Sequence, residues 1–109
     1  MKDYFNLFIQ LSKQQCLKND YIDKQKLKKH NFASRKLKEI REEMKKSDCS
    51  AVLENLLRYD DERVKLNAAT ACIEMGVFID DATNVLLEII EKSDDSTLSF
   101  SAKMILKNL

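Results

Sequence analysis

Few residues of this chain could support covalent or metal chemistry. His30 is the only histidine, and the three cysteines are Cys16, Cys49 and Cys72. A cysteine becomes a nucleophile when a nearby base takes its proton, and thiolates with imidazole form zinc sites. The cysteines are separated by 33 and 23 residues, which fits neither a disulfide framework nor paired metal ligands. We therefore expect no catalytic residue, no metal ion and no cofactor.

The remaining alternative is a catalytic pair in which His30 activates the Cys16 thiol as a nucleophile. It is disfavoured because Cys16 and Cys72 fall on apolar helical stripes, where burial suppresses thiol ionisation. We interpret the cysteines as reduced thiols and His30 as a solvated polar side chain.

Adjacent carboxylates occur at Asp60–Asp61 and again at Asp94–Asp95. Such pairs can share a proton or bind a cation. Each pair, however, stands just before an apolar periodic segment, where the N-terminus of a helix favours negative charge. We interpret these residues as helix caps. The chain has a single glycine, so it also has no glycine-rich phosphate loop.

The two acidic pairs belong to an internal repeat that spans residues 50–109. A shift of 34 superposes both acidic pairs and the positions that follow them: Asp60, Asp61, Val64, Leu66, Ala68, Ala71, Cys72 and Met75 on Asp94, Asp95, Leu98, Phe100, Ala102, Ile105, Leu106 and Leu109. The preceding apolar positions repeat at a shift of 33, with Leu53, Leu56 and Leu57 on Leu86, Ile89 and Ile90. A helix, an acidic turn and a second helix at this period are typical of helical-repeat solenoids.

The composition indicates an all-α fold in a single domain. The chain has 109 residues, no proline and one glycine, whereas sheet and loop-rich proteins draw on both residues for their turns. No apolar run is long enough to cross a bilayer, and the N-terminus lacks the pattern of a secretory signal. We expect a soluble protein of the cytoplasm.

The N-terminal half should form two helices. The first is expected from about Asp3 to Lys18, with Asn19–Asp20 as its stop and the next cap. The lysine-rich stretch 21–46 keeps helical spacing in its second half, which indicates either one long helix or a break near residues 29–31. The apolar stripe of that half is Ala33, Leu37, Ile40 and Met44.

The C-terminal half should form two helical hairpins. Gly76 is expected to end a helix in the left-handed conformation, and Val77–Ile79 to tuck against the core. We expect Asp80 and Asp81 to cap a helix over residues 82–92. The small residues 67–71 should allow close helix packing, and Leu98, Ala102, Ile105 and Leu109 should form the buried stripe of the last helix.

Charge is unevenly distributed. Residues 1–47 contain 13 basic and 6 acidic residues, whereas residues 48–109 contain 6 basic and 12 acidic residues. This uneven distribution of charge informs us about which molecules the protein can attract, and it says little about the fold.

The stretch from Leu56 to Ala69, with its leucine pair, acidic turn, Val64 and alanine pair, resembles a HEAT repeat. Together with Asn31, Leu37, Ile40 and the tail from Leu98 to Leu106, the chain resembles a short bacterial HEAT-like, armadillo-type family catalogued as domain of unknown function twenty-nineteen. The resemblance implies one HEAT-like superhelix of about six helices over residues 1–109, in which residues 1–47 form a basic segment and residues 48–109 an acidic two-repeat segment. It also implies a relation to immunity proteins that neutralise bacterial toxins, including contact-delivered ones.

The leading functional interpretation is a non-catalytic module that binds a cognate toxin, for instance a nuclease with a basic groove, through acidic side chains. The expected partner-binding residues are Asp60, Asp61, Glu62, Asp94, Asp95, Glu54, Glu88 and Glu91. The alternative is a scaffold for another protein. Another interpretation is that the same carboxylates are ordinary surface residues that contact only solvent.

Binding of nucleic acid is a third interpretation. It would use the basic residues of the N-terminal half, Lys24, Lys26, Lys28, Lys29, Arg35, Lys36 and Lys38. It is disfavoured because the aromatic residues Tyr4, Phe5, Phe8 and Phe32 mostly fall on apolar stripes and do not alternate with the lysines, and because the acidic half would repel a polyanion. We expect no membrane partner.

Overall fold

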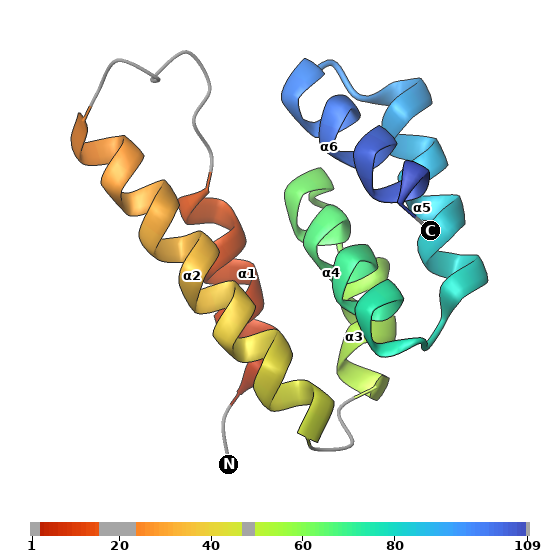
Figure 1. Ribbon diagram of the computed structural model, residues 1–109, viewed down its shortest axis with the longest axis horizontal. Coiled ribbons are helices and arrows are strands. Elements are labelled where there is room, and N and C mark those ends of the chain that lie inside the picture. The colour runs from red at the N-terminus through yellow and green to blue at the C-terminus, as the bar shows by residue number, and fades with distance from the viewer. Residues whose placement is uncertain (1–2, 16–23, 47–49, 109) are drawn as a thin grey trace. The chain divides into compact units, whose positions relative to one another are not determined.

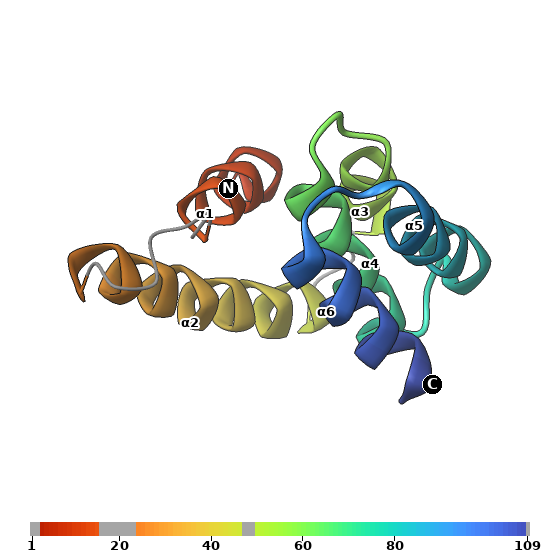
Figure 2. The same ribbon diagram turned by 90° about the horizontal axis from the view of Figure 1, so that it is seen from above.

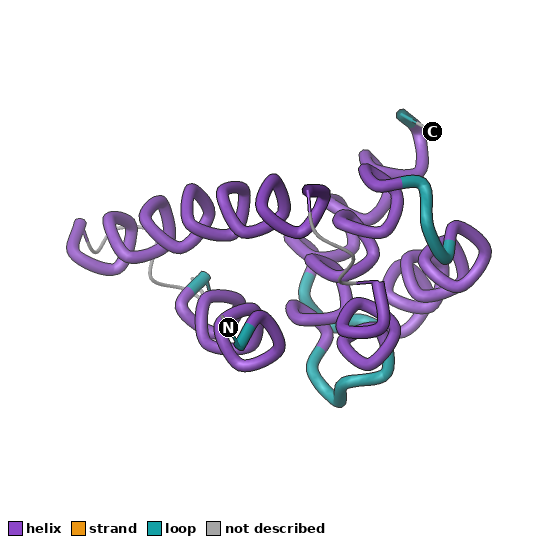
Figure 3. The backbone as a smooth tube through the Cα atoms, turned by 90° about the horizontal axis from the view of Figure 1, so that it is seen from below, coloured by secondary structure: helices purple, strands orange, loops and turns teal. Residues whose placement is uncertain are grey.

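The computed structural model of this protein describes residues 3–15, 24–46 and 50–108, and their side chains except at positions 24–27 and 29. The described residues form six α-helices joined by loops, with no strand among them (Figure 3). The predicted all-α fold is therefore confirmed. The chain divides into two compact units, the N-terminal unit Met1–Cys49 and the C-terminal unit Ser50–Leu109. That they form one domain and one superhelix stays a prediction.

In the N-terminal unit, α1 (Tyr4–Gln14) and α2 (Lys24–Lys46) pack side by side as an antiparallel pair (Figure 1). Asp3 caps α1, because its carboxylate accepts the Asn6 amide at 3.1 Å. α1 ends earlier than the predicted Lys18, since the Gln15 amide turns back to the Ser12 carbonyl at 3.2 Å. The predicted stop and cap at Asn19–Asp20 lie outside the described residues.

The predicted apolar stripe of α2 is confirmed, since Ala33, Leu37, Ile40 and Met44 are all buried. α1 contributes Phe8 to the same core. α2 runs without a break through residues 29–31, so the alternative of an interrupted helix is wrong.

The C-terminal unit consists of α3 (Ser50–Leu57), α4 (Glu62–Met75), α5 (Ile79–Lys92) and α6 (Ser96–Lys107). They form the two predicted hairpins, α3–α4 and α5–α6, and α4 packs against the other three helices. α4 can have three neighbours because its small side chains let helices approach closely. Its buried small residues are Asn67, Ala68, Ala69, Ala71 and Cys72.

Local signals that end and begin helices operate as predicted at Asp61, at Gly76 and at Asp95. Gly76 ends α4 with φ 71°, and Cβ-bearing residues rarely adopt this conformation. Its amide bonds the Ile73 carbonyl at 3.2 Å, and the Val77 amide bonds the Cys72 carbonyl at 3.0 Å, which is the Schellman pattern. Asp95 caps α6.

The start of α5 differs from the prediction. The helix begins at Ile79, not at residue 82, and its N-cap is Phe78, which has φ 49° and makes no side-chain cap. The left-handed turn at Phe78 redirects the chain so that the Ala82 amide already bonds the Phe78 carbonyl, at 2.8 Å. Asp80 and Asp81 therefore lie inside the first turn, where they favour the helix through its dipole instead of capping it. Ile79 is exposed, so the prediction that it tucks inward is wrong.

Candidate protein-interaction surface

Two of the eight predicted partner-binding carboxylates serve the fold. Asp61 precedes α4 and accepts the Val64 amide at 3.1 Å. Asp95 precedes α6 and accepts the Thr97 amide at 2.9 Å and the Leu98 amide at 3.4 Å. Helices leave their first amides without backbone partners, and these two carboxylates satisfy them. Both side chains are half-buried, and their hydrogen bonds constrain their orientation.

The acidic turns before α4 and before α6 lie at the same end of the C-terminal unit (Figures 1 and 2). Glu62, from the first turn of α4, and Ser93, from the turn between α5 and α6, line one shallow depression. The side chains of Asp60, Glu62 and Asp94 are exposed at these turns. We call these three residues the acidic turn cluster.

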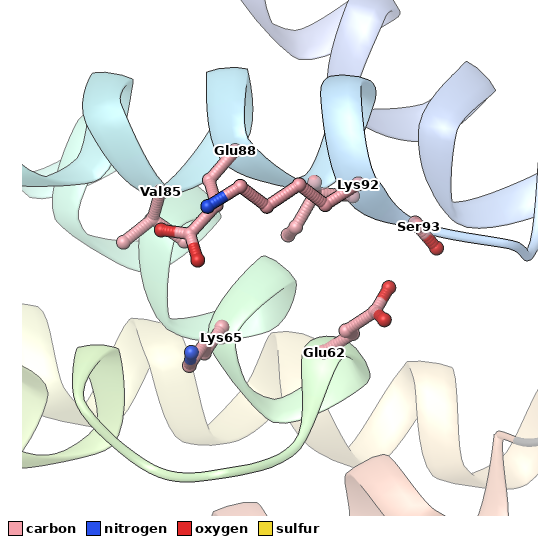
Figure 4. A pocket seen from close by; sticks show the side chains of 7 residues that line it. Glu62, Lys65, Val85, Glu88, Lys92 and Ser93 are labelled. Carbon is pink, nitrogen blue, oxygen red and sulfur yellow. The ribbon is translucent and has the colours of Figure 1, made fainter.

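The depression itself is not acidic. Its cavity volume is about 60 Å³, and its lining residues are Glu62, Lys65, Val85, Glu88, Ile89, Lys92 and Ser93. Two carboxylates and two ammonium groups leave this lining without net charge. In Figure 4 the Lys92 amine extends along α5 toward the Glu88 carboxylate, and Glu62 lies across the opening beneath Ser93. The negative charge of Glu88 is therefore partly balanced by the Lys92 amine.

The remaining predicted carboxylates lie on helices. Glu54, on α3, approaches the Arg58 guanidinium at 3.5 Å. Glu91 is exposed on α5 and does not line the depression. An exposed pair such as Glu54–Arg58 contributes little to stability, but it does balance the carboxylate's charge.

Sequence reasoning missed an exposed apolar position on α6. Phe100 is 64% exposed, whereas its repeat equivalent on α4, Leu66, is 3% exposed. Met104, one turn further along α6, is 41% exposed. The alignment of the repeats predicts the same environment for Leu66 and Phe100. The two positions differ because of their place in the C-terminal unit. α4 is packed against α3, α5 and α6, whereas α6 contacts α5 and α4 and has no further helix of its unit beyond it.

The described cysteine, Cys72, is fully buried on α4. Burial raises the pKa of its thiol to about 12, and the negative charge of Asp81 adds to the shift. The prediction that burial suppresses ionisation is confirmed for Cys72, which remains a neutral thiol near pH 7. Cys16 and Cys49 lie outside the described residues.

His30 is not the solvated side chain that we expected. It is half-buried, and its Nδ1 lies 2.8 Å from the Gln15 carbonyl, just beyond the end of α1. The Gln15 side chain in turn donates to the Ser34 hydroxyl at 2.8 Å. These contacts fix the end of α1 against α2, so His30 has a structural partner that the sequence did not reveal.

The basic stretch of α2 is exposed where its side chains are described, namely at Lys28, Arg35, Lys36 and Lys38. The side chains of Lys24, Lys26 and Lys29 lie outside the described portion of the structure. Phe32 is 46% exposed, and the Lys36 amine lies 5.7 Å from the centre of its ring. The expectation that the aromatic residues do not alternate with the lysines is therefore wrong for Phe32. An aromatic ring does stand among basic side chains on this helix.

Among the described residues, no three histidine, cysteine or carboxylate side chains gather in a way that would hold a metal ion. Within the same residues, no helix combines the length and the apolar character needed to cross a membrane.

Comparisons with known proteins give a family but no activity. Searches of the curated proteins and of the solved structures each found no significant match. A family model described as a domain of unknown function, DUF2019, matches residues 2–109. Because this match covers nearly the whole chain, the protein belongs to the DUF2019 family.

Proposed function

We propose that this chain is a non-catalytic protein-binding module of the cytoplasm, acting as an immunity protein that binds and neutralises a cognate bacterial toxin. The observation that carries the proposal is the acidic turn cluster, because two turns 34 residues apart in sequence present exposed carboxylates at one end of the C-terminal unit. A toxin that cleaves nucleic acid has a basic groove, and a cluster of opposite charge speeds association with such a surface.

The contacts of the carboxylates narrow the proposed interface. Asp61 and Asp95 are engaged as caps, and Glu54 and Glu88 lie beside basic side chains. Asp60 and Asp94 are exposed turn residues, and Glu62 lies at the edge of the depression. The proposed contact set is therefore the acidic turn cluster, which is smaller than the set of eight carboxylates predicted from sequence.

The first test uses gene order to obtain a partner. If the gene directly follows one for a large secreted protein with a variable C-terminal domain, that domain is the candidate toxin. Purified domain and purified chain should bind, and coexpression of the chain should restore growth of cells that express the domain. No binding and no rescue would refute the immunity proposal.

The second test locates the interface. The triple variant Asp60→Lys, Glu62→Lys and Asp94→Lys should lower the association rate at least ~10-fold at low salt, since steering depends on net complementarity. A matched control makes the same change of charge at exposed acids elsewhere, Glu39→Lys, Glu42→Lys and Asp80→Lys. Equal effects of the two variants would show that overall charge matters and that the turn cluster is not the contact.

The alternative remains a scaffold that binds a protein other than a toxin. An isolated gene, without a neighbouring secreted protein, would favour it. The same charge-reversal variants apply once a partner is known.

A nucleic-acid function has one specific observation in its favour, the exposed ring of Phe32 among Lys28, Arg35 and Lys36. Bases stack on exposed aromatic rings, and neighbouring cations neutralise phosphates. A gel-shift with mixed single-stranded RNA and DNA at low salt tests it. Retardation that Phe32→Ala abolishes would support this function, and no retardation would exclude it.

A further inference from the structure

The two repeats of the C-terminal unit differ in how the second helix is covered. On α4 the position of Leu66 is buried, and α4 contacts α3, α5 and α6. On α6 the equivalent position carries Phe100, the most exposed of the large hydrophobic side chains in the described residues. Phe100 and Met104 lie one turn apart, so both occupy the side of α6 opposite the buried Leu98 and Ala102. α6 therefore has an apolar face without a covering helix in its own unit.

The charges along this face change sign from one end to the other. Asp94 and Asp95 lie at the N-terminus of α6, whereas Lys103 and Lys107 are exposed in its second half. Helical spacing places Phe100, Lys103 and Lys107 on one face, with the apolar pair near its middle. Asp94 thus lies at one end of this face and Lys107 at the other, and Lys103 lies between Phe100 and Met104.

The two ends of this face are complementary to each other when a second copy is reversed. In an antiparallel pair centred on the middle of α6, Lys107 of one copy lies opposite Ser96 of the other, two residues after Asp94. Phe100 and Met104 of the two copies then meet around a two-fold axis. The dipoles of antiparallel helices also attract each other.

We propose that the exposed face of α6 binds a second copy of this chain, through an antiparallel α6–α6 contact with two-fold symmetry. The inference does not rest on the proposed toxin binding, but the two surfaces share Asp94. Phe100→Ala distinguishes the two proposals, because Phe100 lies outside the acidic turn cluster. A single helix pair covers less area than a standard stable interface, so the dimer is weak, with a dissociation constant of about 10 to 100 μM.

Sedimentation equilibrium of the full chain tests the proposal. At low salt the mass should rise from 12.7 kDa toward twice that value as concentration increases to about 1 mM. Phe100→Ala and Met104→Ser should each weaken association at least ~10-fold, since buried apolar anchors dominate small interfaces. Leu87→Ala is the matched control, because Leu87 is 47% exposed on α5, outside this face. Far-UV circular dichroism checks that each variant keeps its helices.

Charge exchange tests the orientation. Asp94→Lys and Lys107→Asp should each weaken the dimer, and the double variant should restore it, because each copy again presents opposite charges. A chain that stays monomeric at all concentrations would overturn the proposal. So would equal weakening by Leu87→Ala and Phe100→Ala, or a double variant no better than its parents.

Discussion

Asp94 and Asp95 are neighbours in sequence, but the structure gives them different roles. The Asp95 carboxylate accepts the Thr97 amide at 2.9 Å and the Leu98 amide at 3.4 Å, at the start of α6. Asp94 is exposed just outside the helix. Replacing each by alanine should therefore separate a carboxylate that stabilises the fold from one that is free to bind a partner.

The expected magnitudes differ clearly. Asp95→Ala removes an N-cap, which destabilises a protein by about 1 kcal/mol, within a range of about 0.5 to 2 kcal/mol. Asp94→Ala changes an exposed side chain and should stay within about 0.5 kcal/mol of the parent. For a unit of this size, about 1 kcal/mol corresponds to a shift in Tm of about 4–8 °C.

Urea unfolding followed by circular dichroism measures both free energies of unfolding. Asp95→Asn is the control, because asparagine caps as well as aspartate and isolates the contribution of the charge. Asp95→Asn should recover most of the free energy of unfolding that Asp95→Ala loses. If Asp94→Ala destabilises the protein as much as Asp95→Ala, or if Asp95→Asn is no better than alanine, the assignment of Asp95 as a structural cap is wrong.

Two further predictions concern α4. Burial raises the pKa of the Cys72 thiol from 9.0 to about 12, so the folded state holds the thiol proton more tightly than the unfolded state does. The free energy of unfolding should therefore be unaffected by this group below pH 9 and should fall as the pH rises from 9 to 12. Urea unfolding at pH 8 and pH 10 should show a loss of up to about 1.4 kcal/mol per pH unit that is absent in Cys72→Ala, and parallel losses in both proteins would contradict it. A Cβ at Gly76 would meet no atom within 4 Å, so Gly76→Ala should destabilise only through its φ of 71°, by about 1 kcal/mol, and Gly76→Asn by less. Equal Tm values for the parent and Gly76→Ala would refute this.

Much of the fold could be predicted because it depends on near neighbours in sequence. The α2 stripe of Ala33, Leu37, Ile40 and Met44 follows from helical spacing alone. The chain reversal at Gly76 follows from the need for a left-handed residue. The start of α5 was wrongly predicted because no capping side chain marks it. The residue before the helix is Phe78, which has no group that could cap and which adopts the left-handed backbone conformation.

The candidate site was less predictable than the fold. Sequence patterns do not rank the eight carboxylates, yet capping occupies Asp61 and Asp95, and Lys92 lies beside Glu88 in the depression. These differences depend on hydrogen bonds and on side chains that approach from other helices. Periodicity along one helix carries no information about them.

By itself, the sequence determined an all-α chain with a duplicated hairpin and an uneven distribution of charge, since helical period, caps and repeats are local properties. Only the tertiary structure decided which equivalent positions are covered, as Leu66 is and Phe100 is not. It also decided that His30 meets the end of α1. The physical reason is that burial depends on the neighbours that packing brings to a helix, and those neighbours come from distant segments of the chain.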